Sequence, residues 1–125
     1  MVRKATVRWL RCGSYDEARN YTVCLYVHEW AGKAYYVGKV GRAFFGGRYT
    51  LSYRHWIDGC LEHGGQLYIG TLVEGSEDLL DAVESILIET LKPPKNIRKP
   101  PCQKDVTLYH VGETPKQLQG REGPN

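Results

Sequence analysis

Glu84 is the side chain whose position most clearly calls for a chemical explanation. It lies in residues 76–92, where apolar residues recur with helical spacing before a Pro-Pro stop. On a helical wheel, Glu84 projects beside Leu80 and Leu91 rather than with the polar residues. An ionised carboxylate facing a core costs several kcal/mol unless it is paired or bound to a metal. Glu84 is therefore a candidate metal ligand, with a partly exposed helix edge or an ion pair with an arginine as alternatives. The expected solvent stripe of this helix consists of Asp78, Asp81, Ser85, Glu89 and Lys92.

Four predicted elements would position this helix and its carboxylate. Residues 21–28 alternate like a strand, and residues 33–40 follow after a short Gly-containing turn, which is typical of a β-hairpin. Residues 48–62 return to helical spacing and end at a His-Gly-Gly break. Residues 66–73 read as a third strand. The order along the chain is thus hairpin, helix, strand, helix.

This order predicts an α+β fold. We expect a small antiparallel sheet of about three strands flanked by helices, with short strand-like additions at each end. The 125 residues, 42% hydrophobic and 25% charged, suit a single globular domain with a core at about 21–97. Residues 106–111 are a candidate edge strand, and residues 114–125 read as a loose tail.

Short motifs on these elements carry a resemblance to a known family. Residues 24–26 (Cys-Leu-Tyr) stand on the first strand, and residues 36–38 (Tyr-Val-Gly) stand on the second after nine intervening residues. Lys39 follows the glycine, Arg48 opens the next helix, and residues 84–96 run from a glutamate through a Pro-containing turn to an asparagine. Over about 21–97 this pattern resembles the GIY-YIG nucleases. It is close to the nuclease domain of the repair enzyme that makes incisions around DNA damage, and to small restriction and homing endonucleases.

The resemblance implies a phosphodiester hydrolase that depends on a divalent cation. A single Mg²⁺ or Mn²⁺ would be held by Glu84, water and phosphate oxygens. Arg48 would clamp the non-bridging phosphate oxygens, although Arg42 competes for that role. Asn96 is expected to position the loop on the metal side, or the phosphate, through its amide.

The remaining implied catalytic residues handle the attacking water. Tyr26 is expected to orient or deprotonate the water, with Tyr36 close by across the hairpin. A free phenol titrates near pH 10, so Tyr26 would need a neighbouring cation, and Lys39 is the candidate. His55 is a reserve acid or base with an appropriate pKa.

The expected substrate is DNA, with RNA not excluded. The formal net charge is only +3, but basic residues crowd the N-terminus and the Pro-rich segment after residue 91. Little of the chain is left for a recognition domain, so specificity would come from loops, from a homodimer or from a recognition partner protein. The expected nucleic-acid contacts are Arg42, Lys95, Arg98 and Lys99.

Two rival functions and a compartment follow from the same residues. One rival is a catalytically inactive member of the fold that binds nucleic acid or protein. The other is an unrelated α+β interaction module in which Glu84 makes an ordinary ion pair. No stretch approaches the roughly 18 apolar residues of a membrane span, and the N-terminus lacks a signal-peptide pattern. Because the four cysteines are widely spread, we expect reduced thiols, no zinc site and a cytoplasmic, intracellular protein.

Overall fold

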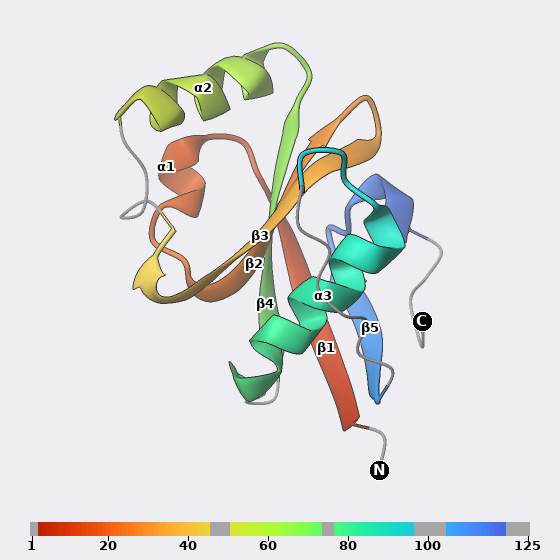
Figure 1. The fold of residues 1–125 in the computed structure, drawn as a ribbon. Coiled ribbons are helices and arrows are strands. Elements are labelled where there is room, and N and C mark those ends of the chain that lie inside the picture. The colour runs from red at the N-terminus through yellow and green to blue at the C-terminus, as the bar shows by residue number, and fades with distance from the viewer. Residues whose placement is uncertain (1–2, 46–50, 74–76, 97–104, 120–125) are drawn as a thin grey trace.

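The computed structural model describes residues 3–45, 51–73, 77–96 and 105–119. These residues form one five-stranded sheet with helices on both faces (Figure 1). None of the helices in these ranges is long and apolar enough to cross a membrane. The elements are β1 (Arg3–Cys12), α1 (Tyr15–Ala18), β2 (Thr22–Trp30), β3 (Lys33–Phe44), α2 (Leu51–Glu62), β4 (Gln66–Val73), η2 (Glu77–Leu79), α3 (Leu80–Leu91), β5 (Val106–Gly112) and η3 (Lys116–Leu118).

The sheet corrects the predicted fold. It has five strands in the order β3-β2-β4-β1-β5 rather than about three. It is also mixed rather than antiparallel, because β1 pairs antiparallel with β4 and parallel with β5. The α+β class and the predicted order of hairpin, helix, strand and helix are confirmed. The N-terminal addition is a full strand because Ala5, Val7 and Trp9 are buried at alternate positions between its exposed cations.

The hairpin of β2 and β3 forms one edge of the sheet and carries both tripeptide motifs. Its turn has positive φ at Ala31 (54°) and Gly32 (79°), the backbone combination that matches the twist of paired strands. Pairing then changes register, from Glu29 opposite Ala34 to His28 opposite Tyr36, which leaves Tyr35 as an extra residue in β3. A bulge of this kind re-aims side chains.

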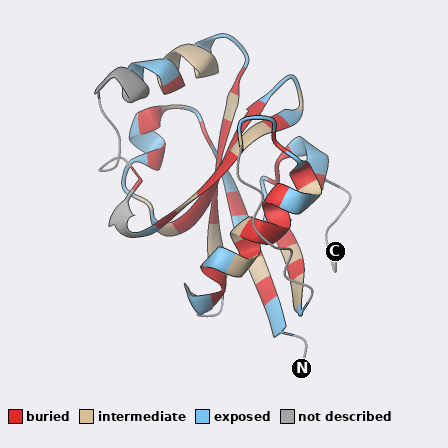
Figure 2. Ribbon diagram, viewed as in Figure 1, coloured by how far each residue is buried: buried red, intermediate tan, exposed pale blue. Residues whose placement is uncertain are grey.

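Two hydrophobic clusters lie on opposite faces of the sheet (Figure 2). Helix α3 packs on one face, where its apolar residues form one cluster with alternate residues of β1, β2 and β3. Helices α1 and α2 contribute to the cluster on the other face. Because successive strand residues point to opposite faces, Leu25 and Val27 lie on the α3 face, whereas Cys24 and Tyr26 lie on the α2 face.

The C-terminal segment is packed through Gln119, which corrects the expected loose tail. Leu118 is fully buried in the cluster beneath α3. The Lys116 amide donates to Glu29 Oε2 at 2.8 Å, and the Ala34 amide donates to Gln117 Oε1 at 2.6 Å. The segment therefore holds the hairpin turn from the side, through contacts between distant residues that no local pattern signals. The candidate edge strand at 106–111 is confirmed as β5.

Candidate functional site

The structure describes seven of the eleven side chains to which the sequence assigns a functional role. Arg48, Arg98 and Lys99 lie outside the described residues, and Arg42 is described only as part of the β3 backbone. The choice between Arg42 and Arg48 as the phosphate clamp therefore stays as the sequence leaves it. The described side chains are Tyr26, Tyr36, Lys39, His55, Glu84, Lys95 and Asn96.

The register of the hairpin divides these residues between the two faces of the sheet. Tyr26 pairs with Gly38, and Tyr36 pairs with His28, so both tyrosines point to the α2 face. Lys39 pairs with Leu25, whose side chain lies under α3. The tyrosines thus lie together on one face, and Lys39 meets the α3 carboxylates on the other.

Lys39 brings β3 and α3 together through charge. Its Nζ contacts Asp81 Oδ1 directly and lies 3.7 Å from Glu84 Oε1. The hydrogen bond to Asp81 is the main cause that raises the pKa of Lys39; burial opposes the increase, and the charge of Glu84 adds to it. Lys39 is therefore positively charged at neutral pH. We refer to Lys39, Asp81 and Glu84 as the lysine–carboxylate cluster.

Glu84 lies at a partly exposed helix edge, which is one of the alternatives given by the sequence. Its side chain is 21% exposed, and Lys39 is a cationic neighbour among the described residues. Asp81 is the residue that sequence reasoning missed, because it was assigned only to the solvent stripe. Its spacing from Glu84 could have indicated its role, because residues three apart are neighbours on a helix surface.

Ser85 corrects the predicted polar stripe of α3. It is buried, and its Oγ donates to the Asp81 carbonyl at 3.1 Å. This bond inside the helix satisfies the hydroxyl, so a small polar residue can face the core.

The two carboxylates of the cluster are the oxygen donors that a hard cation would use. Asp81 and Glu84 both face the same positive charge at Lys39, so their oxygens converge. Mg²⁺ is commonly held by one or two carboxylates plus waters and substrate phosphates. In the four described ranges no group of three or more His, Cys, Asp or Glu side chains is placed to hold a metal. The pair therefore fits a largely hydrated cation.

Tyr26 covers Gly38 and gives a physical reason for the glycine of the Tyr-Val-Gly motif. A Cβ at position 38 would lie 2.3 Å from Tyr26 Cζ and 2.4 Å from its hydroxyl oxygen. Tyr26 is only 5% exposed, and Phe45 packs against its ring at a centroid distance of 5.0 Å. Tyr36 lies 6.0 Å from the Tyr26 ring and is more exposed. Tyr36 is thus the phenol that solvent and substrate reach more easily.

His28 lies at the centre of an aromatic group on the α2 face. Its ring stacks on Tyr35 at 5.8 Å and meets the edge of Trp56 at 5.4 Å. Burial lowers the pKa of His28 to about 4, so the ring is neutral near pH 7. The bulge at Tyr35 explains the arrangement, since it places two successive tyrosines beside one histidine. His55 is exposed on α2.

Asn96 fastens the segment after α3 to the edge of β3. Its Nδ2 donates to the Val37 carbonyl at 2.8 Å, and its Oδ1 accepts from the Val37 amide at 2.9 Å. The Lys95 amide adds a third bond to the Tyr35 carbonyl at 2.9 Å. The asparagine side chain therefore mimics a neighbouring strand, and it holds Lys95 close to the Tyr-Val-Gly strand.

The buried thiols do not belong to a reactive site. Cys12, Cys24 and Cys60 are free, and burial is the main cause that raises the pKa of Cys12 to about 11 and that of Cys24 to about 12. The thiolate is the reactive form of cysteine, so the Cys12 and Cys24 thiols are inert at neutral pH.

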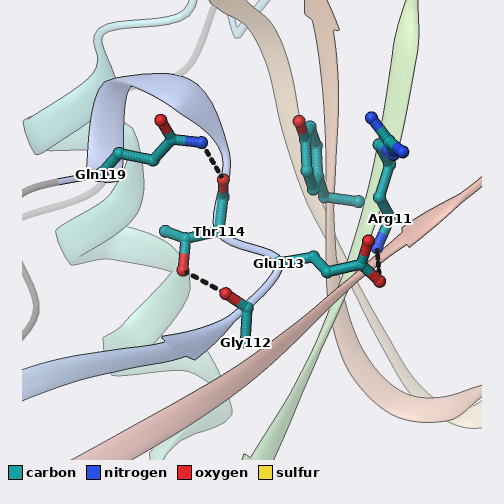
Figure 3. Close-up of a pocket in the computed structure, with 6 residues that line it drawn as sticks. Arg11, Gly112, Glu113, Thr114 and Gln119 are labelled. Carbon is teal, nitrogen blue, oxygen red and sulfur yellow. Dashed lines mark hydrogen bonds between the residues drawn. The ribbon is translucent and has the colours of Figure 1, made fainter.

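A pocket of about 460 Å³ lies at the C-terminal ends of β1 and β5, beside η3 (Figure 3). Glu113 Oε1 accepts from the Arg11 amide at 3.4 Å, and Gln119 Nε2 donates to the Thr114 carbonyl at 3.2 Å. Most of its polar groups thus bond to one another, and none of the predicted site residues is among its lining residues. These are Arg11, Tyr68, Gly112, Glu113, Thr114 and Gln119.

Comparisons of the chain with known proteins found no relative. No protein-family model matches the chain, and no curated protein or solved structure matches it either.

Proposed function

We propose that the chain is a metal-dependent endonuclease that hydrolyses DNA phosphodiester bonds. The observation that supports this most is the meeting of Lys39 and Glu84 at 3.7 Å. Lys39 follows the Tyr-Val-Gly motif on β3, and Glu84 is the α3 glutamate that lies outside the predicted polar stripe. Both residues belong to the pattern that resembles the GIY-YIG nucleases, and the fold brings their side chains together.

Glu84, assisted by Asp81, would hold Mg²⁺ or Mn²⁺. When bound, the cation would neutralise charge developing on the phosphate and lower the pKa of a bound water. Lys39 orients both carboxylates in the free protein and supplies a positive charge that attracts a phosphate. The carboxylates would then be held in place before substrate arrives, so less ordering is needed on binding.

On the α2 face, Tyr36 would contact the phosphate backbone of the substrate, and Tyr26 would hold Tyr36 in position. This division follows from exposure, because Tyr26 is nearly covered and its hydroxyl lies over Gly38. β3 is the edge strand of the sheet. Tyr36 and Lys39 are three residues apart on it, or about 10 Å along the strand, and they point to opposite faces. A nucleic-acid backbone would therefore have to wrap around this edge to contact both.

A catalytically inactive binding protein is the second candidate. The feature that favours it is the lysine–carboxylate cluster itself, since an ion pair at a helix edge satisfies Glu84 without any metal. Surface ion pairs of this kind contribute at most about 1 kcal/mol to stability. A purely structural role therefore predicts small effects of substitution on stability, and no cleavage by wild type or variant.

Cleavage of supercoiled plasmid separates the two candidates. Wild type, Glu84→Gln and Glu89→Gln would be incubated with Mg²⁺ or Mn²⁺, with and without EDTA. Glu89 is exposed on the same helix, so its variant matches the charge change away from the cluster. We expect EDTA to abolish nicking, and Glu84→Gln to reduce its rate on the order of 100-fold while Glu89→Gln retains it. An intact plasmid in all samples of folded protein would remove the catalytic proposal.

A further inference from the structure

Strands β1, β4 and β5 leave part of one sheet face uncovered. Helix α3 lies over one face of these strands, and α1 and α2 lie toward the end of the sheet where β1 finishes (Figure 1). On the face away from α3, Leu10 of β1 is 39% exposed and Val111 of β5 is 41% exposed. Large apolar side chains this exposed on two neighbouring strands mark a surface that the described chain does not fill. We refer to this area as the open face.

The register assigns further residues to the open face. Arg8 pairs with Val111 on one side and with Thr71 of β4 on the other, so these three side chains point the same way. Two residues earlier in β1, Thr6 pairs with Tyr109 of β5. The open face consists of Lys4, Thr6, Arg8 and Leu10 of β1, Thr71 and Val73 of β4, and Thr107, Tyr109 and Val111 of β5.

The charge of this surface is of one sign. The three strands contain four cationic residues, all in β1, and no Asp or Glu. Arg3 and Arg11 lie on the opposite face, where Arg3 pairs with Asp78 and Arg11 lines the pocket of Figure 3. Lys4 and Arg8 remain on the open face and are exposed, and no ion pair is found for either within the described part of the chain. A polyanion would therefore meet two cations and no opposing carboxylate from these strands.

An aromatic ring lies among these cations. Tyr109 is partly exposed on β5, beside Thr6 and between the levels of Lys4 and Arg8. Flat sheet faces that combine aromatic rings with backbone-binding cations suit unpaired bases, which stack on the rings while phosphates contact the cations. Leu10 and Val111 extend the apolar floor. A duplex offers only its outer backbone to a flat surface and would leave the ring and the aliphatic residues unused.

We propose that the open face binds single-stranded nucleic acid, with Lys4 and Arg8 on phosphates and Tyr109 stacked on a base. The inference extends the proposed nuclease function by naming a surface that holds a substrate strand. The open face lies on the same side of the sheet as Tyr26 and Tyr36, so a strand bound there can run toward the hairpin. Binding needs no cation at Glu84, and it is tested in EDTA without any cleavage.

The test measures anisotropy of a fluorescein-labelled single-stranded DNA 20-mer in EDTA over a range of salt concentrations. Lys4→Gln/Arg8→Gln is compared with Arg19→Gln/Lys33→Gln, whose positions are also exposed cations but lie off the open face. Each phosphate contact to a single strand contributes about 0.7 to the slope of log K against log salt. We expect the first double variant to lower that slope by about 1.4 and the second to leave it unchanged.

Tyr109→Leu separates stacking from charge. Loss of one stacked base costs about 1–3 kcal/mol, so we expect affinity to fall about 5- to 150-fold with the salt slope unchanged. Competition with unlabelled duplex of the same sequence should displace the single strand poorly. Thermal unfolding by circular dichroism confirms that each variant is folded.

The outcomes distinguish this inference from the nuclease proposal. If plasmid remains uncut but single strands bind through Lys4, Arg8 and Tyr109, the open face stands and catalysis falls. If plasmid is nicked while the Lys4/Arg8 variant binds like its control, the inference is wrong and the substrate lies elsewhere. Equal affinity for duplex and single strand also overturns the inference. A concentration-dependent dimer that Leu10→Asn dissociates overturns it too, because the open face would then bind a second copy of the chain.

Discussion

Acidification should destabilise this protein through His28. The ring is 3% exposed, and its burial lowers its pKa to about 4. In the unfolded chain the pKa returns to about 6.5. Between these values the unfolded chain binds more protons than the folded one, so stability rises with pH across this window. Each pKa unit is worth about 1.4 kcal/mol, and lowering the pH from 6.5 to 4 should therefore cost about 3 kcal/mol.

The assay is urea unfolding at a series of pH values from 7 to 4, followed by far-ultraviolet circular dichroism. His28→Phe keeps an aromatic ring beside Tyr35 and Trp56 but removes the titrating group. Its free energy of unfolding should fall about 3 kcal/mol less than that of wild type over this range. Other acid-sensitive groups contribute to both proteins and cancel in the difference.

His55→Gln serves as the control because His55 is exposed, and its pH profile should follow wild type. Parallel curves for wild type and His28→Phe would refute the reasoning, since they would mean that burial does not keep this ring neutral. A difference of the opposite sign would mean that the folded protein stabilises the protonated ring.

Two further substitutions test how β3 is held. Gly38→Ala should destabilise the fold by about 1–3 kcal/mol, because the new Cβ collides with the buried Tyr26 ring. In the control Gly41→Ala, the new Cβ meets no atom within 4 Å, so stability should change by less than about 0.5 kcal/mol. Equal urea midpoints for the two variants would contradict the packing. Asn96→Leu should cost about 1–3 kcal/mol by removing both bonds to Val37. Hydrogen exchange at the Val37 amide should accelerate at the same time, and unchanged protection there would show that the asparagine does not hold the edge.

Local signals predicted the part of the fold that surrounds the candidate site. The hairpin, its turn at Gly32, the helix ending near residue 92 and the edge position of Glu84 each depend on residues close in sequence. Such patterns are legible because side-chain direction follows from helix and strand periodicity. The Tyr26–Gly38 contact was not predicted, because it depends on the register of the two strands.

Contacts between distant residues were the part that could not be predicted. Three such contacts join segments far apart in the sequence, so no local periodicity indicates them. They are the burial of Leu118, the parallel pairing of β1 with β5 and the ion pair of Lys39 with Asp81. The N-terminal strand was expected only as a short addition, because cations stand on both sides of its α3-facing residues Ala5, Val7 and Trp9. Ser85 was placed on the solvent side because a helical wheel does not show that its hydroxyl can bond to a carbonyl of the same helix.

The interior position of β1, between β4 and β5, has a consequence for how the chain acquires its structure. Both of its neighbours come much later in the sequence, since Cys12 pairs with Leu67 and Arg3 pairs with Val106. At about 5–20 residues per second, translation leaves β1 without its last partner for several seconds. Non-local pairing of this kind slows folding. Trp9 and its apolar neighbours are exposed during that interval, so the nascent chain should be most prone to chaperone binding and aggregation before β5 emerges.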